Sequence, residues 1–156
     1  MNIMDITLPI KIIVAEDESL YRKIIIDFLN ENEKFKVIGE AKDGETAVKL
    51  AKELIPNLMV IDLGLPVMSG IEAITKIKKS NPTIKIVVLT SHINQDEAIE
   101  SLAAGANAYV DKGININNLK MIIETVNNGA VWISPIIGQR ILHDIINEYK
   151  NKHKNN

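Results

Sequence analysis

The sequence predicts an α/β protein in which helices cover both faces of a doubly wound parallel sheet. Short apolar runs alternate with amphipathic segments five times along the chain. The runs are continuously apolar more than alternating, which is typical of strands buried on both faces. The 156 residues, 46% of them hydrophobic, suffice for one domain with its own core. This alternation of strands and helices predicts a parallel sheet.

The first two repeats occupy the N-terminal third of the chain. Residues 10–15, IKIIVA, predict a buried strand, and residues 19–30 then place apolar side chains at helical spacing. Residues 35–41, FKVIGEA, predict a second strand with partial alternation. Residues 46–54, TAVKLAKEL, predict the helix that follows it.

The next repeats follow the same order. Residues 58–61 predict the third strand, and residues 71–79 predict a helix with its isoleucines on one face. Residues 84–89, IKIVVL, predict the fourth strand. Residues 96–104 predict a helix that ends at Gly105, a residue type that suits a C-terminal cap.

The last repeat closes a predicted domain of residues 10–129. It consists of a short strand at residues 108–110 and a helix at residues 117–127. Residues 1–9 precede the domain as an N-terminal extension.

Residues 130–156 are predicted to be a linker, an amphipathic helix and a frayed polar tail. The segment GAVWISP can add an extra strand, and Pro135 suits the first turn of a helix. The apolar stripe of this helix can fold back on the domain, form a homodimer interface or belong to a linker helix. The stripe consists of Ile137, Ile141, Leu142, Ile145, Ile146 and Tyr149.

Composition and motifs exclude several classes of protein. The absence of cysteine excludes disulfides, thiolate chemistry and cysteine zinc sites, and a net charge of -2 gives no electrostatic footprint for nucleic acid. No strand is followed by a Gly-x-Gly-x-x-Gly or a Walker-type motif. The sequence shows neither a signal peptide nor a membrane-spanning run. We therefore expect a soluble cytoplasmic protein with no membrane or nucleic-acid partner of its own.

Polar side chains stand at the carboxyl ends of the predicted strands, where parallel α/β sheets form their sites. Glu16 and Asp17 follow the first strand, and Asp62 follows the third. Thr90 follows the fourth strand, and Lys112 closely follows the fifth. Each residue has an ordinary explanation, as a turn residue, helix-terminal charge, cap or surface lysine. Their joint occurrence at strand ends favours a site.

These residue types suit phosphoryl chemistry if the first and third strands are neighbours. Three converging carboxylates repel one another, and a hard cation such as Mg²⁺ relieves that repulsion, with a backbone carbonyl near Gly64 as a further ligand. Asp62 can then attack phosphorus and become an acyl phosphate. Lys112 is placed to neutralise the transferring group, and the Thr90 hydroxyl to donate a hydrogen bond to it.

Residues 11 to about 129 resemble the receiver domain of bacterial two-component response regulators. The resemblance depends on four segments in order, IVAEDE, VIDLGLPVMSGIEAI, VVLTSH and GANAYVDK. The segment GAVWISP resembles the LuxR/NarL/FixJ-type group, whose helix-turn-helix output domain we expect to be absent from this chain. The resemblance implies a flavodoxin-like (βα)5 sheet with strand order 2-1-3-4-5, here with an extra C-terminal helix.

The resemblance also implies a role for each site residue. Asp62 is the implied phosphoacceptor for a sensor histidine kinase, in a Mg²⁺-dependent reaction. Glu16, Asp17, Asp62 and the Gly64 carbonyl are the implied metal ligands. Asp62, Thr90 and Lys112 form the implied catalytic set. The implied protein catalyses only its own phosphorylation and dephosphorylation, and reaches DNA only through an output domain.

The resemblance also implies a switch and positions that tune dephosphorylation. Thr90 and Tyr109 form the implied switch, in which the ring turns inward when Thr90 moves toward the phosphate. Gly64 and His92 occupy positions that tune dephosphorylation. Gly113 replaces the proline that follows the lysine in many receivers, so we expect a trans peptide bond there.

Other functions compete with the phosphorylation switch. A receiver-like interaction module would work without phosphate, although such modules lack one of the site residues and none is missing here. A phosphohydrolase of the haloacid-dehalogenase type needs a second aspartate where Gly64 stands. A flavodoxin-like FMN binder needs a phosphate-binding loop that does not follow the first strand.

Overall fold

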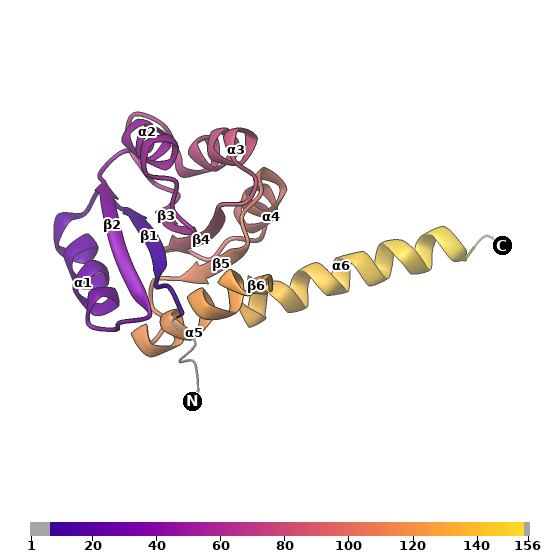
Figure 1. The fold of residues 1–156 in the computed structure, drawn as a ribbon. Helices are drawn as coiled ribbons and strands as arrows, with labels where there is room; N and C mark the ends of the chain where they lie inside the picture. The colour runs from indigo at the N-terminus through magenta and orange to yellow at the C-terminus, as the bar shows by residue number, and fades with distance from the viewer. Residues whose placement is uncertain (1–6, 155–156) are drawn as a thin grey trace.

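The computed structural model describes residues 7–154, and a six-stranded parallel sheet lies at its centre (Figure 1). Helices α1 and α5 cover one face of the sheet, and α2, α3 and α4 cover the other. The strand order is β2-β1-β3-β4-β5-β6, so the predicted order of the first five strands is confirmed. Residues 1–6 of the predicted extension and residues 155–156 of the predicted tail lie outside the described residues.

The elements alternate as the sequence predicts. The strands are β1 (Ile10–Ala15), β2 (Phe35–Ala41), β3 (Leu58–Asp62), β4 (Lys85–Thr90), β5 (Ala108–Asp111) and β6 (Trp132–Ile133). The helices are α1 (Ser19–Asn30), α2 (Gly44–Leu54), α3 (Gly70–Ser80), α4 (Gln95–Ala104), α5 (Ile116–Asn127) and α6 (Pro135–His153).

The strand register brings the predicted polar residues to one edge of the sheet. In the parallel pair β1–β3, Ala15 lies opposite Ile61, so Glu16 and Asp62 follow at the same level. In the pair β4–β5, Thr90 lies opposite Asp111. The strands β3, β4 and β5 each extend one residue beyond the predicted end, and their last residues are Asp62, Thr90 and Asp111.

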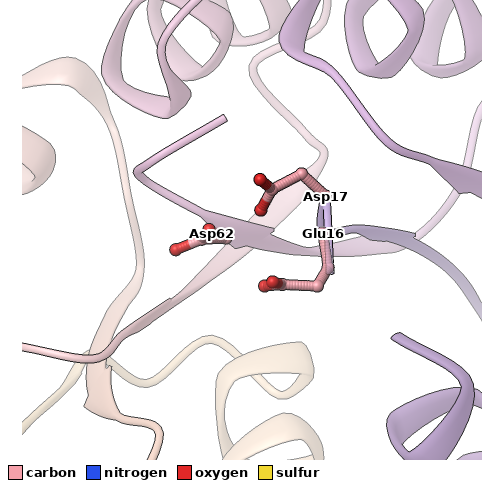
Figure 2. Close-up of side chains that lie close together, drawn as sticks. All are labelled: Glu16, Asp17 and Asp62. Carbon is pink, nitrogen blue, oxygen red and sulfur yellow. The ribbon is translucent and has the colours of Figure 1, made fainter. Parts of the chain in front are cut away.

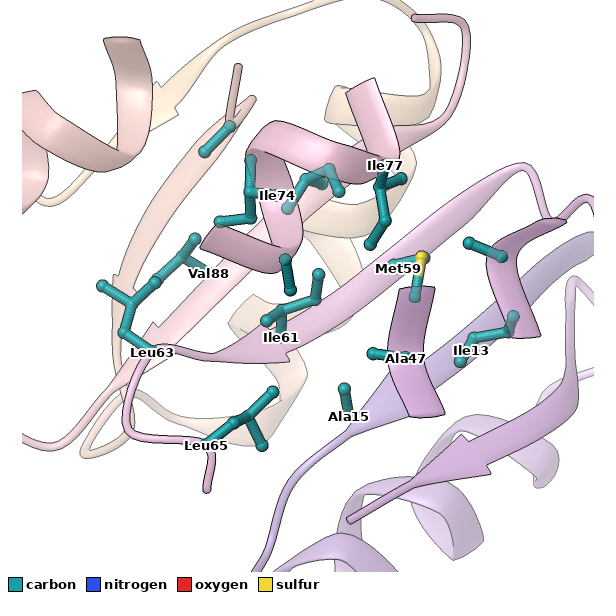
Figure 3. Close-up of a cluster of buried hydrophobic side chains, with 14 of the residues drawn as sticks. Ile13, Ala15, Ala47, Met59, Ile61, Leu63, Leu65, Ile74, Ile77 and Val88 are labelled. Atoms are coloured by element: carbon teal, nitrogen blue, oxygen red, sulfur yellow. The ribbon is translucent and has the colours of Figure 1, made fainter. Parts of the chain in front are cut away.

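Side chains of the central strands pack alternately into two apolar layers, as the period of a strand requires. In β1, Ile13 and Ala15 face α2 and α3, whereas Ile12 and Val14 face α1 and α5. Figure 3 shows the first layer, in which Ile61 of β3 lies among residues of the neighbouring elements. Both faces are covered, which explains why the strands read as continuous apolar runs.

Capping residues explain where two of the helices begin and end. Asp43 accepts a hydrogen bond from the Thr46 backbone N–H at 2.7 Å, so α2 begins at Gly44, before the predicted residue 46. Gly105 ends α4 in the left-handed conformation, with φ of 116°, which confirms the predicted cap.

The C-terminal segment differs from its prediction in one respect. The prediction that the polar tail frays is wrong for residues 150–153, because α6 continues to His153. Residues 132–133 form β6 and pair with β5, so the extra strand is present. Ile137 of α6 is buried and Ile141 packs beside it, whereas the stripe beyond them is exposed as the helix extends away from the sheet (Figure 1).

The longest helix in the described part of the chain is α6. Among residues 7–154, none of the helices combines the length and apolar character needed to cross a membrane.

Candidate functional site

Three carboxylates converge at the ends of β1 and β3 (Figure 2). Glu16, Asp17 and Asp62 each offer one oxygen atom, and these atoms lie within 4.8 Å of one another. The side chains of Glu16 and Asp62 are only 5% and 13% exposed, whereas Asp17 is exposed. Carboxylate oxygens with one side open to water are the ligands that Mg²⁺ prefers, so the residues present fit this ion.

Lys112 brings one positive charge to the three carboxylates. Its Nζ atom lies 2.8 Å from Glu16 Oε2 and 3.6 Å from Asp62 Oδ1, and its side chain is 15% exposed. The Lys112 backbone N–H donates to the Thr90 carbonyl at 2.8 Å, which fixes the start of the loop after β5. One ammonium beside three carboxylates leaves the site with surplus negative charge.

Burial and the neighbouring charges shift the pKa values of Glu16 and Lys112. Burial raises the pKa of the Glu16 carboxyl; the hydrogen bond from Lys112 opposes this rise and the charge of Asp62 adds to it. Burial lowers the pKa of Lys112, but its contacts with Glu16 and Asp62 outweigh burial and raise it. A bound cation would therefore compete with a proton for Glu16.

The hydroxyl groups of Thr90 and Tyr109 are held by a different partner, Glu97 of α4. Thr90 Oγ1 lies 3.2 Å from Glu97 Oε1, and the Tyr109 hydroxyl lies 3.1 Å from the same oxygen. Tyr109 is fully buried and its hydroxyl also accepts from the Asn94 backbone N–H at 3.1 Å. The ring of the predicted switch residue is thus inward, while the Thr90 hydroxyl is bonded to α4.

The sequence did not predict Glu97 as a site residue, because its position near the start of α4 suggests a capping role. Asn94 caps α4 by accepting from the Glu97 backbone N–H at 3.0 Å, and an acidic residue three positions after a cap usually reads as part of a capping box. The Glu97 side chain instead turns toward Thr90 and Tyr109.

Gly64 and His92 lie beside the site in different ways. A Cβ atom added at Gly64 would stand 3.6 Å from Asp62 Oδ2, so this exposed position directly borders the carboxylate. His92 contributes its backbone carbonyl, 3.2 Å from Thr90 Oγ1, while the residue itself is exposed. Residues 7–154 contain no cis peptide bond, so the bond between Lys112 and Gly113 is trans as expected.

Two unpredicted features hold the acidic residues in place. A Cβ atom at Gly70 would stand 2.5 Å from the Asp62 carbonyl oxygen, so only glycine lets α3 begin this close behind Asp62. Arg22 of α1 donates from Nη1 to the Glu16 carbonyl oxygen at 2.7 Å. Neither residue stands at a strand end, and the sequence predicted site residues only at or near strand ends.

The chain is similar to known proteins over most of its length. The family model of the response regulator receiver domain matches residues 12–124. The chain is 34% identical over 131 residues to the response regulator protein VraR of Staphylococcus saprophyticus, and 36% identical over 132 residues to the response regulator GacA of Pseudomonas aeruginosa. These matches cover 83% and 85% of this chain but 63% and 62% of the relatives, so the chain spans about three fifths of their length.

Solved structures give the same result for the fold. A two-component response regulator of the LuxR family from Aurantimonas sp. SI85-9A1 superposes with a TM-score of 0.83 at 29% identity, over 88% of this chain and 99% of that one. The isolated REC domain of RcsB from Salmonella enterica serovar Typhimurium, in the presence of the phosphomimetic BeF₃⁻, superposes with a TM-score of 0.76 over 84% of this chain and 97% of that one. Its 22% identity supports the fold alone.

Proposed function

The chain belongs to the response regulator receiver-domain family, and we propose that it is a phosphorylation-switched signalling receiver whose phosphoacceptor is Asp62. The observation that supports this most is the position of Asp62, a mostly buried carboxylate between two other carboxylates and the Lys112 ammonium. The proposed phosphodonor is a sensor histidine kinase, and the proposal carries with it a cytoplasmic location. Beyond accepting and releasing its own phosphoryl group, we propose no turnover of an external substrate.

The proposed chemistry uses the residues at the ends of the strands. An oxygen of Asp62 attacks the phosphorus of phosphohistidine, the P–N bond breaks, and the imidazole leaves with its electron pair and takes up a proton from water. Lys112 neutralises charge on the equatorial phosphoryl oxygens. Mg²⁺, when held by Glu16, Asp17, Asp62 and the Gly64 carbonyl, supplies further neutralisation of that charge.

The proposed switch is the exchange of partners at Thr90. To donate to the phosphoryl group, the Thr90 hydroxyl has to leave Glu97, in the first turn of α4, and the His92 carbonyl, in the loop before it. The Tyr109 hydroxyl is then the one of these two hydroxyl groups that stays bonded to Glu97. Phosphorylation would in this way bias the position of α4, and Gln95 of α4 donates to Asp144 of α6 at 2.6 Å.

A small phosphodonor tests the proposal without the kinase. Acetyl phosphate and Mg²⁺ are expected to add the mass of one phosphoryl group to the intact protein, and hydroxylamine is expected to remove it because acyl phosphates are labile. Asp62→Asn, which keeps the shape of the side chain, is expected to remain unlabelled. A wild-type protein that gains no mass, or an Asp62→Asn variant labelled to the same extent, would contradict the proposal.

A further inference from the structure

The aromatic ring of Tyr21, in the first turn of α1, lies against the proposed phosphoryl site. The Lys112 Nζ atom stands 4.8 Å from the centre of this ring. The same nitrogen stands 2.8 Å from Glu16 Oε2 and 3.6 Å from Asp62 Oδ1. Two carboxylates and one aromatic face therefore surround the ammonium.

The ring compensates for the flexibility of the lysine. A lysine side chain ends in a point charge on a flexible stem, with three N–H donors that can point in many directions. An aromatic face within about 6 Å attracts the ammonium electrostatically, and more strongly when water is partly excluded. The Lys112 side chain is only 15% exposed, so this condition is met. The ring favours conformations in which the ammonium stays between Glu16 and Asp62.

The first turn of α1 fixes where the ring lies. Tyr21 and Ile25 stand one turn apart on the same helix face, and Ile25 is buried in the apolar layer below. The next residue, Arg22, ties the same turn to the Glu16 carbonyl at 2.7 Å and forms an ion pair with Glu40 at 3.6 Å. The position of the ring is thus coupled to the position of Glu16.

The surroundings of Tyr21 keep the ring neutral and partly dry. Burial, followed by the charges of Glu16 and Asp62, raises the pKa of Tyr21 to about 12, so the phenol stays protonated near neutral pH. The ring forms one wall of a groove between α1 and the loop after β5. Other residues of its lining are Ile24, Ile25, Lys112, Ile114 and Ile116.

We propose that Tyr21 is a positioning residue of the phosphoryl site, which holds the Lys112 ammonium toward Asp62 through the face of its ring. This inference rests on the proposed function of Asp62. The ring contacts Lys112 and acts through it, and the phenolic hydroxyl has no part in the role. Phenylalanine at this position should therefore work as well as tyrosine, and leucine should not.

The first test measures Lys112 itself and needs no phosphate. Only the charged ammonium is attracted to the ring, so Tyr21→Leu is expected to lower the Lys112 pKa by about half a pH unit, while Tyr21→Phe leaves it unchanged. NMR titration of ¹³C-labelled lysine side chains measures this value. Equal Lys112 pKa values in the two variants would show that Tyr21 only fills space and would overturn the inference.

The second test measures labelling by acetyl phosphate with Mg²⁺. Tyr21→Leu is expected to slow labelling by about threefold, and Tyr21→Phe to match the wild type. Leu20→Ala, at the exposed neighbour of Tyr21, serves as the matched control and should also match the wild type. Far-UV circular dichroism and thermal unfolding check that each variant is folded.

The outcomes separate the inference from the proposed function. A wild-type protein that takes up no phosphoryl group contradicts the role of Asp62, while the lysine titration still decides whether the ring holds Lys112. If the wild type is labelled but Tyr21→Leu is labelled equally fast, or Tyr21→Phe is as slow as Tyr21→Leu, positioning through the ring is wrong.

Discussion

The carboxylate side and the hydroxyl side of the site lie at the same edge of the sheet, but they are held together differently. On the carboxylate side, three carboxylates converge at the ends of β1 and β3, and one ammonium contacts two of them, Glu16 and Asp62. On the hydroxyl side, Thr90 at the end of β4 and Tyr109 within β5 share one oxygen of Glu97. The first side has surplus charge that a cation can relieve, whereas the second is already satisfied by hydrogen bonds.

This difference suggests that the two sides contribute opposite free-energy changes to the proposed switch. A ligand that binds the carboxylate side gains free energy by removing repulsion. The hydroxyl side has to give up hydrogen bonds to a charged group, which contribute about 1.5–3 kcal/mol each. A phosphoryl group and its cation shift the balance between two arrangements of Thr90 if the gain on the carboxylate side exceeds this loss.

Removal of the single positive charge should have the largest effect. Lys112→Met leaves the mostly buried carboxylates of Glu16 and Asp62 without their partner, so the free energy of unfolding at pH 7 should fall by about 3 kcal/mol without metal. Added Mg²⁺ should restore part of this loss, because it binds only the folded site. Urea titrations with EDTA or Mg²⁺ measure both effects. Lys36→Met on β2, an exposed position, should change little, and an equal loss there would contradict the prediction.

Glu97 tests the hydroxyl side, with a smaller effect. Glu97→Ala frees Thr90 from its competing acceptor, so the affinity for BeF₃⁻ with Mg²⁺ should rise by about fivefold. The free energy of unfolding should fall by about 1.5 kcal/mol, because Tyr109 loses the same acceptor. Isothermal titration calorimetry and urea unfolding measure the two quantities. Glu100→Ala, exposed on the same helix, is the control, and a weaker affinity in Glu97→Ala would show that Glu97 supports the bound arrangement instead.

The two sides of the site also differ in how much of each could be predicted from the sequence. The carboxylate side lies at strand ends, which continuous apolar runs locate well. The sequence predicted that Glu16, Asp62 and Lys112 lie close together, and the structure brings them together. The order of the strands came only from the family resemblance. Glu97 and Tyr21 were missed because both lie within helices, where spacing along the chain does not show which strand or loop a side chain contacts.

The C-terminal helix shows a second limit of sequence patterns. Its apolar stripe correctly predicted a helix, since periodicity depends on the geometry of the helix itself. The same pattern did not indicate where packing stops, although Ile137 is fully buried and Leu142 is 59% exposed. What covers an apolar face depends on the surrounding structure, which periodicity does not describe.

The dependence of stability on pH tests the protonation of Glu16 on the carboxylate side. The folded-state pKa of Glu16 lies above its ordinary value of 4.5, so the folded protein binds this proton more tightly than the unfolded chain. Stability from this group is therefore lost as pH rises from about 4.5 through the raised pKa, and gained as pH falls. Relative to Glu16→Gln, the wild type in EDTA should become more stable as pH is lowered from 7 toward 5, as urea unfolding measures. A difference between the two proteins that stays constant with pH would contradict this.

Asp17 should have the smallest effect on stability and therefore isolates metal binding from folding. Its carboxylate belongs to the acidic cluster, but the residue is exposed, so Asp17→Asn should change the free energy of unfolding without metal by less than about 0.5 kcal/mol. Mg²⁺ affinity, measured by calorimetry, should still fall at least about tenfold, because a charged ligand is lost. Glu18→Gln, at the exposed neighbouring position, should leave both quantities unchanged. If Asp17→Asn kept the wild-type affinity, the cation would have to be held by Glu16, Asp62 and the Gly64 carbonyl without Asp17, and the surplus charge would be relieved closer to Lys112.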